Sequence, residues 1–325
     1  AAAVAAAAVA AATASSAAAA GLADLAPDEA YSRVLDAFQA AYEADDRSAL
    51  DELSDANTVF TFPTMGGGKA QFSGDTMDEW IASYSKMIAW FRHENRVVYA
   101  RDNGNVLVGT ATVHFMAHAD FPGVGGCLGL AYEGWRMVIG DNGKLREAEA
   151  VFPLDHLFHQ CHAKTPEWRA VATANDKARD VVWRFFQAVS HSYAYEYAAG
   201  APECLDMCAD DLELVVADAS GDVATLRGRD GAAKVLASWG SAVARMSVSN
   251  VVAAASIDGR DIIATVTLGV KYRGDVQSAA VVGEGWLLRL NEHGQVARAE
   301  AVFSASALAP GGQEFVAARS AKQEL

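Results

Sequence analysis

The chain contains an internal repeat, and this repeat limits the folds open to it more than any other feature does. The tripeptide Glu133-Gly134-Trp135 returns as Glu284-Gly285-Trp286, 151 residues later (284 − 133), and the segment 148–152 returns at 299–303 with the same spacing. Identities of three and five residues in one register indicate a duplicated domain. Upstream the spacing is 155, so the second copy has four fewer residues where the first carries the loop 121–126. Loops tolerate such differences in length, and 325 residues leave room for two domains.

Both copies show the same order of predicted elements, because apolar residues follow helical spacing first and strand-like alternation afterwards. In the first copy we expect helices at 28–44, 48–53 and 77–91, and strands at 58–62, 96–101, 105–119, 127–140 and 144–152. In the second copy we expect helices at 176–197, 202–208 and 232–245, and strands at 212–217, 248–256, 260–273, 277–290 and 295–303. Gly104, Gly143, Gly259 and Gly294 lie in the predicted hairpin turns. The sequence therefore predicts an α+β fold of two tandem domains.

This order of elements resembles that of the nuclear transport factor 2-like (SnoaL-like) superfamily. The segment 143–152 resembles the closing strand of SnoaL-like domains, and 154–160 resembles the family's terminal segment. The resemblance implies two cone-shaped domains, each with about three helices packed on a curved antiparallel sheet that encloses a pocket. Members of the superfamily include isomerases, polyketide cyclases, epoxide hydrolases, dehydratases and non-enzymatic binding or assembly domains. The predicted boundaries are an Ala-rich segment 1–26, a first domain 27–160, a linker 161–173, a second domain 174–308 and a tail 309–325.

The resemblance also implies an acidic residue just after the closing strand, where SnoaL-like enzymes place a general acid or base. This chain has Pro153 and Ser304 at those two positions, and neither side chain transfers a proton at neutral pH. The family's usual acid–base chemistry is therefore in doubt for both copies, although another residue in the cone can substitute.

The repeated polar and aromatic residues are the best remaining site candidates. Glu133 and Trp135 lie two apart and hence on one face of a strand, with Glu149 on the adjacent closing strand. The equivalents in the second copy are Glu284, Trp286 and Glu300. One interpretation is a pocket with an aromatic wall and paired carboxylates. The other is a cluster that packs the domains together, because duplicated folds also keep their packing residues.

Histidines distinguish the first copy from the second. His114 and His118 lie four apart on one predicted strand, with Tyr132 on the next, whereas the second copy has Gly269 and Arg273 at the aligned positions. We therefore expect any catalysis to use Glu133 or Glu149 with His114 in the first cone, with Tyr132, Trp135 and His118 as ligand-binding candidates. The second cone is predicted to be catalytically silent, because its inner strands carry no histidine and Glu300 is expected to stay ionised near Arg298.

No cofactor or metal site is predicted. The cluster 155–162 carries three histidines and a cysteine, but it does not reproduce a structural zinc spacing and a solvated helical tail is the simpler interpretation. The segment Gly66-Gly67-Gly68-Lys69 lacks the final Ser or Thr of a phosphate-binding loop. Cys204 and Cys208 lie four apart on a predicted helix, which favours free thiols over a disulfide.

The charge excludes one class of partner. A net charge of −15, with no stripe of Lys and Arg, makes nucleic acid an unsuitable ligand, and the Ala-rich start is a poor membrane span. That start has three interpretations: the remnant of a targeting sequence, an Ala-rich helix or a disordered tail. The last residues, Lys322-Gln323-Glu324-Leu325, are either a retrieval-type signal or a polar tail. Together these features predict a location in an organelle lumen, the plastid or the endoplasmic reticulum.

Two functions remain. The first is a small-ligand-binding or assembly subunit in a larger complex, in which the two cones form an intramolecular pseudo-dimer. The alternative is a cyclase, isomerase or hydrolase acting on a small apolar substrate in the first cone only. A buried carboxylate or histidine of raised pKa in an apolar pocket would favour the enzyme, and a cone filled by aromatic side chains would favour the binding or assembly role.

Overall fold

The computed structural model describes residues 21–64, 68–73, 76–101, 103–120, 128–152, 167–194, 203–217, 223–256, 258–272 and 279–304. The elements of the first half are η1 (Leu22–Asp24), α2 (Pro27–Ala44), α3 (Ser48–Asp51), β1 (Val59–Pro63), β2 (Lys69–Phe72), α4 (Met77–Ser85), β3 (Ile88–Ala100), β4 (Val106–Ala117), β5 (Leu128–Ile139) and β6 (Leu145–Val151). Those of the second half are α6 (Glu167–Ala194), η4 (Glu203–Met207), β7 (Cys208–Ala217), β8 (Val223–Arg227), α7 (Gly228–Ala242), β9 (Val243–Ala255), β10 (Asp261–Tyr272), β11 (Ala279–Leu290) and β12 (Val296–Val302).

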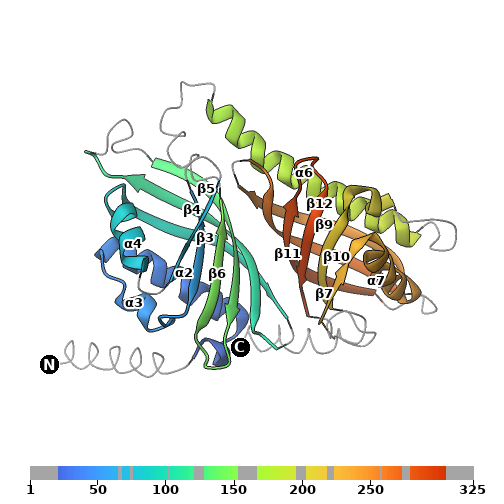
Figure 1. The fold of residues 1–325 in the computed structure, drawn as a ribbon, viewed down its shortest axis with the longest axis horizontal. Helices are drawn as coiled ribbons and strands as arrows, with labels where there is room; N and C mark the ends of the chain where they lie inside the picture. Colours follow the sequence, from blue (N-terminus) through green and yellow to red (C-terminus); the bar gives the residue numbers. More distant parts are fainter. Residues whose placement is uncertain are drawn as a thin grey trace, which may run out of the picture.

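The strands form two sheets of six with the same topology. Their orders are β2-β1-β6-β5-β4-β3 and β8-β7-β12-β11-β10-β9. Neighbours are antiparallel except β1 with β6 and β7 with β12, which are parallel. Figure 1 shows the sheets side by side in the middle of the molecule. Helices α2, α3 and α4 lie on the side of the first sheet that faces away from the second, and α7 lies on the side of the second sheet that faces away from the first. The predicted fold class, α+β with two tandem domains, is confirmed.

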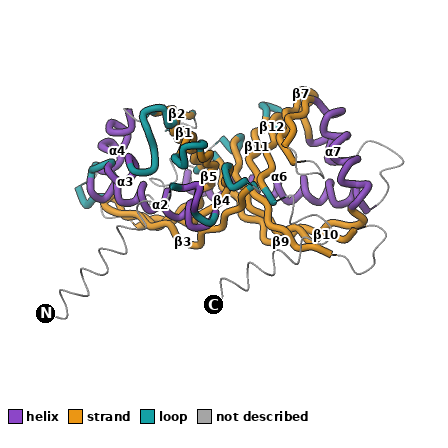
Figure 2. Tube along the Cα trace, turned by 90° about the horizontal axis from the view of Figure 1, so that it is seen from below, coloured by secondary structure: helices purple, strands orange, loops and turns teal. Residues whose placement is uncertain are grey.

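A β-bulge at equivalent positions bends one long strand of each sheet. Asn95 in β3 and Asn250 in β9 both have a positive φ, 49° and 50°, at a register shift against the neighbouring strand. Asparagine tolerates this left-handed conformation, and a bulge increases the local bend of a strand. Each curved sheet packs against the long helix of its own half, α2 or α6, around a separate apolar core. Figure 2 shows the two halves from below.

The outer faces of the two sheets pack against each other. Seven apolar side chains from both halves form the contact, among them Val108 and Ile263, which are repeat equivalents. Thr110 and its equivalent Thr265 lie at the centre, with their hydroxyl oxygens 3.0 Å apart. A Cβ on Gly134 would lie 2.3 Å from the Cβ of Ile263, and a Cβ on Gly285 would lie 2.6 Å from that of Val108. The glycine of the repeated Glu-Gly-Trp motif therefore permits close packing of the two sheets.

The expected elements differ from the observed ones at several boundaries. The helix expected at 77–91 ends at Ser85, and the chain continues from Ile88 as a strand in which Phe91 and His93 alternate into the core. Helix α6 begins at Glu167, within the expected linker 161–173. The short strands β2 and β8 were not expected, since four or five residues give too little alternation to be recognised.

Two other expectations are met directly. Gly143 and Gly294 occupy equivalent turns with φ of 73° and 75°. Trp135 and Trp286, repeat equivalents by the spacing of 151, lie at equivalent register positions, opposite Ala150 and Ala301, and both are buried. Among the helices in the described part of the chain, none has the length and apolar character needed to cross a membrane.

Candidate functional site

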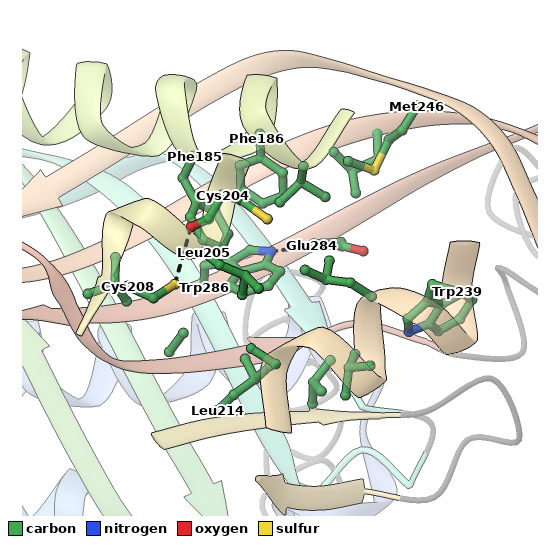
Figure 3. Close-up of a pocket in the computed structure, with 18 of the residues that line it drawn as sticks. Phe185, Phe186, Cys204, Leu205, Cys208, Leu214, Trp239, Met246, Glu284 and Trp286 are labelled. Carbon is green, nitrogen blue, oxygen red and sulfur yellow. Dashed lines mark hydrogen bonds between the residues drawn. The ribbon is translucent and has the colours of Figure 1, made fainter. Parts of the chain in front are cut away.

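The second cone encloses an apolar cavity of about 100 Å³. Helix α6, the sheet and helix α7 enclose it, and its aromatic lining consists of Phe185, Phe186, Trp239, Trp286 and Phe303. The rest of the lining is aliphatic or sulfur-containing except for one side chain, Glu284, and the described residues that line it include no Lys, Arg or His. Figure 3 shows Glu284 and Trp286 extending from β11 into this space. The cavity thus combines an apolar wall with a single carboxyl group.

Glu284 is buried in surroundings that disfavour its charge. The indole Nε1 of Trp286 donates a hydrogen bond of 2.8 Å to its Oε2. Burial raises the pKa of Glu284 to about 7, and the hydrogen bond from Trp286 opposes this shift. A carboxyl group with a pKa near neutrality can accept or donate a proton at physiological pH.

Two thiols line the same cavity. Cys204 and Cys208 are both buried and are not joined in a disulfide, and the Sγ of Cys208 donates to the backbone carbonyl of Cys204 at 3.3 Å. Burial raises the pKa of Cys208 to about 11, with Arg229 opposing the shift. Since the thiolate is the reactive form, Cys208 contributes apolar surface here and is a poor nucleophile at neutral pH.

The first cone is packed with aromatic rings and keeps a cavity of only about 40 Å³. The rings of Phe62 and Trp80 stack with their centroids 3.8 Å apart, and Trp135 packs on Phe38 at 5.1 Å. The rest of the aromatic lining consists of Tyr42, Tyr84, Phe91, Phe115 and Phe152. This is the aromatic filling that the sequence analysis associated with a binding or assembly role and not with catalysis.

The carboxylate of the first cone has two internal partners. Glu133 Oε2 lies 2.9 Å from Trp135 Nε1 and 3.2 Å from His93 Nε2. The other ring nitrogen of His93, Nδ1, is buried and has no partner among the described residues. His93 is not among the candidates predicted from the sequence, because it falls between the helix expected to end at 91 and the strand expected to begin at 96. Its burial on alternate positions with Phe91 was the signal that could have identified it.

Glu149 and Glu300 lie on the opposite face of their sheets from Glu133 and Glu284. Each accepts hydrogen bonds from arginine side chains of the other half. Arg136 makes a bidentate contact with Glu300, at 2.7 and 3.1 Å, and Arg101 adds a third hydrogen bond at 2.9 Å. Glu149 accepts two hydrogen bonds from Arg289, at 2.8 and 3.1 Å. The expected pocket of paired carboxylates is therefore not formed.

The pKa of Glu149 reflects this ionic contact. Burial alone would raise it, but Lys69, at 2.6 Å, and Arg289 lower it below its usual value. The ionised form is the one that these cations stabilise. Glu149 is thus held as a charged member of the interdomain contact, away from both cavities.

The other first-copy candidates also lie outside the cone. His114 is 43% exposed and faces Glu94 at 3.3 Å, while Tyr132 is exposed on the outer face. His118 follows the end of β4 and lies 3.0 Å from the backbone carbonyl of Ser85. Of the first-copy candidates, the structure brings together Glu133 and Trp135 alone. In the second copy it brings together Glu284 and Trp286.

Several of the remaining sequence features are not covered by the described part of the chain. Pro153, Arg273, the histidine cluster 155–162 and half of the glycine segment 66–69 lie outside the described residues. Within the described ranges, no group of three His, Cys, Asp or Glu side chains is placed to hold a metal ion.

No protein-family model and no curated protein matches this sequence. Solved structures align with single domains of the chain. An inferred polyketide cyclase from Pseudomonas putida is 19% identical with a TM-score of 0.32, and the match covers 40% of this chain and 94% of that one. A second inferred polyketide cyclase, from Xanthomonas campestris, is 14% identical with a TM-score of 0.34, covering 42% and 99%.

An epoxide hydrolase/cyclase-like enzyme with a role in pyran ring formation in the polyether salinomycin is 12% identical with a TM-score of 0.31, covering 39% and 90%. Each match covers about two fifths of the chain, the length of one domain. Similarity at this level assigns no ligand and no reaction.

Proposed function

We propose that the second cone binds a small, mainly apolar ligand that carries one polar group. The observation behind this proposal is the cavity of about 100 Å³ with apolar walls and the single buried carboxyl group of Glu284. Ligand pockets are commonly apolar with a few polar groups that fix orientation. An engineered apolar cavity on the order of 150 Å³ holds benzene, so this one suits a ligand of about four or five heavy atoms.

The first cone supports a structural role. Its aromatic rings fill most of the interior, and the two hydrogen-bonding groups near Glu133 belong to the protein itself. Catalysis confined to the first cone, the alternative drawn from the sequence, therefore has less geometric support than a function in the second. A role as an assembly subunit and a location in an organelle lumen remain predictions, and no contact of the described residues bears on either.

A titration tests ligand binding directly. Small apolar probes of four to six heavy atoms are added while the indole ¹H–¹⁵N signal of Trp286, assigned with Trp286→Phe, is recorded. We expect a saturable shift, because this N–H group borders the cavity. Ala232→Leu adds volume in the lining and should abolish the shift, whereas Val281→Leu, at a 68% exposed position, should not. If no probe produces a saturable shift in the wild type, the proposed function is wrong.

Acid–base catalysis in the second cone is a second candidate function. It is favoured by one observation, the pKa of Glu284 near 7 within an apolar cavity. Exchange of the α-protons of small ketones for deuterium provides a test that does not depend on knowing the substrate. Faster exchange with the wild type than with Glu284→Gln would support catalysis, and equal rates would leave binding as the function.

A further inference from the structure

Strand register identifies the residue of the second cone that corresponds to His93. In the first sheet His93 lies opposite Val113, which lies opposite Ala131. In the second sheet Val248 lies opposite Leu268, which lies opposite Val282. These three positions are repeat equivalents by the spacings of 155, 155 and 151. The imidazole beside the first carboxylate is thus replaced by an isopropyl group beside the second.

This exchange leaves the two carboxyl groups with different neighbours. Glu133 is close to two nitrogen atoms, one of Trp135 and one of His93. Among the described residues, only the indole of Trp286 is hydrogen-bonded to the side chain of Glu284. The cone with the internal histidine has a cavity of about 40 Å³, and the cone without it has one of about 100 Å³. The second cone therefore has room beside its carboxyl group for an N–H group that is not part of the chain.

The rest of the lining restricts the charge of that group. Glu284 is the one carboxyl group of the described lining, and the other ionisable groups there are the thiols of Cys204 and Cys208. An anionic ligand would meet no cation and would be desolvated without compensation. A monocation meets a carboxylate and several aromatic rings, and both attract positive charge. Its alkyl groups would contact the aliphatic walls.

On the basis of the function proposed for the second cone, we propose that its ligand is a small aliphatic ammonium ion. Its N–H group takes the place beside Glu284 that the imidazole of His93 takes beside Glu133. Its alkyl part fills the space between α6, α7 and the sheet. A cavity of about 100 Å³ has room for an alkyl group of about four carbon atoms.

Three probes of nearly equal shape separate charge from apolar contact: isobutylamine, isobutanol and 2-methylbutane. Each is titrated into the full chain at pH 8 and pH 5.5 with the Trp286 indole signal as the readout. We expect isobutylamine to bind at least tenfold more tightly than 2-methylbutane at pH 8. Its affinity should fall at least tenfold at pH 5.5, because Glu284 is then protonated while the amine stays charged. The affinity of 2-methylbutane should change less than threefold.

Two variants assign the effect to the carboxyl group. Glu284→Gln should lower the affinity for isobutylamine at least tenfold and change the affinity for 2-methylbutane by no more than about twofold. The unchanged affinity for 2-methylbutane would also show that the cavity is intact. Val248→His places an imidazole at the position equivalent to His93 and should lower the affinity for isobutylamine by a similar factor. Glu292→Gln removes the same charge from an exposed turn and should change neither probe.

The outcomes distinguish this inference from the function on which it rests. The ammonium ligand is ruled out if 2-methylbutane and isobutanol bind but isobutylamine does not. It is also ruled out if the affinity for isobutylamine rises at low pH. Either result leaves a pocket for a neutral ligand. Equal weakening of all three probes by Glu284→Gln also rules out the ammonium ligand, as does wild-type amine affinity in a folded Val248→His variant. If none of the three probes binds the wild type, the proposed function fails as well.

Discussion

The two cones have the same strand order and the same Glu-Trp pair, yet one is filled and the other is open. The register places five ring-bearing residues of the first cone at positions where the second has aliphatic ones. The pairs are Phe60 with Leu214, Phe62 with Val216, Phe91 with Met246, His93 with Val248 and Phe115 with Val270. The smaller side chains leave the larger cavity, about 100 against about 40 Å³. A few inward positions can therefore change a packed core into a pocket without changing the sheet.

The outer faces of the sheets differ much less than the interiors. Gly134 and Gly285 make reciprocal contacts with Ile263 and Val108, and Thr110 meets its own equivalent. The carboxylates of the closing strands both bind arginines of the other half. Such reciprocal contacts are those of an isologous interface, in which the same patch is used on both sides. The outer faces of the sheets hold the two halves together, whereas the interiors of the cones are free to differ.

The largest expected effect comes from removing the tryptophans. Trp135→Ala should cost about 3–5 kcal/mol of unfolding free energy, because its ring packs on Phe38 and Phe62 in a filled core. Trp286→Ala should cost about 1 kcal/mol less, because its ring borders the larger of the two cavities, about 100 against about 40 Å³. Urea titration monitored by circular dichroism measures both values. Equal losses in the two variants would show that the cones are packed alike.

The next effect is a pH dependence confined to the second cone. The folded-state pKa of Glu284, about 7, lies above the ordinary value of 4.5, so the folded form favours the protonated group. Its contribution to stability is fully present below pH 4.5 and is lost as the pH rises through 7, a change of about 3 kcal/mol. Glu284→Gln should remove this loss, so the variant gains about 3 kcal/mol relative to wild type between pH 4 and pH 8.

Urea titrations of both proteins at pH 4, 6 and 8 measure that gain. Glu292→Gln, in an exposed turn, should follow the wild type at all three values. A constant difference between Glu284→Gln and wild type across this range would mean that Glu284 is solvated in the folded protein.

The fold was largely predictable from the sequence, because the duplicated segments fix the register of the domains and each strand alternates over many residues. The contents of the cones were not predictable to the same degree. Adjacent strand residues point to opposite faces, so Glu149 and Trp135 were placed together only by assuming which residues of β5 and β6 lie opposite each other. The observed register pairs Trp135 with Ala150 and places Glu149 beside Arg136 on the outer face.

His93 and the difference in cavity size were missed for another reason. The residues 86–95 have no strong helical or strand period, so the helix was extended over the start of β3 and the inward position of His93 was hidden. The relevance of Glu284 depends on the smaller side chains opposite it, which come from strands far apart in the sequence. A prediction based on histidine content, on Ser304 and on the ionisation of Glu300 thus favoured the first cone.

Smaller effects are expected at the interface between the sheets. Gly134→Ala and Gly285→Ala should each cost about 1–3 kcal/mol, because the new methyl groups overlap Ile263 and Val108. Neither change should alter probe binding in the second cone by more than twofold, since the cavity lies on the other face of the sheet. Gly269→Ala is a control, because its Cβ would meet only the end of the Ser247 side chain, which can rotate away. A large change in probe binding would show that the interface sets the cavity.

The smallest effect is expected on the outside of the second cone's long helix. Trp183 of α6 corresponds to Leu35 of α2 by the spacing of 148 that relates Ala30 to Ala178 and Phe38 to Phe186, pairs that are buried in both halves. Leu35 is buried, whereas Trp183 is 42% exposed beside Asp180 and Val251. Because part of the Trp183 ring stays in water, Trp183→Ala should cost only about 1–2 kcal/mol, while Leu35→Ala should cost about 2–5 kcal/mol. Urea titration of the two variants measures the unfolding free energy lost at these two equivalent helix positions. A loss at Trp183 as large as that at Leu35 would contradict the partial exposure of this tryptophan.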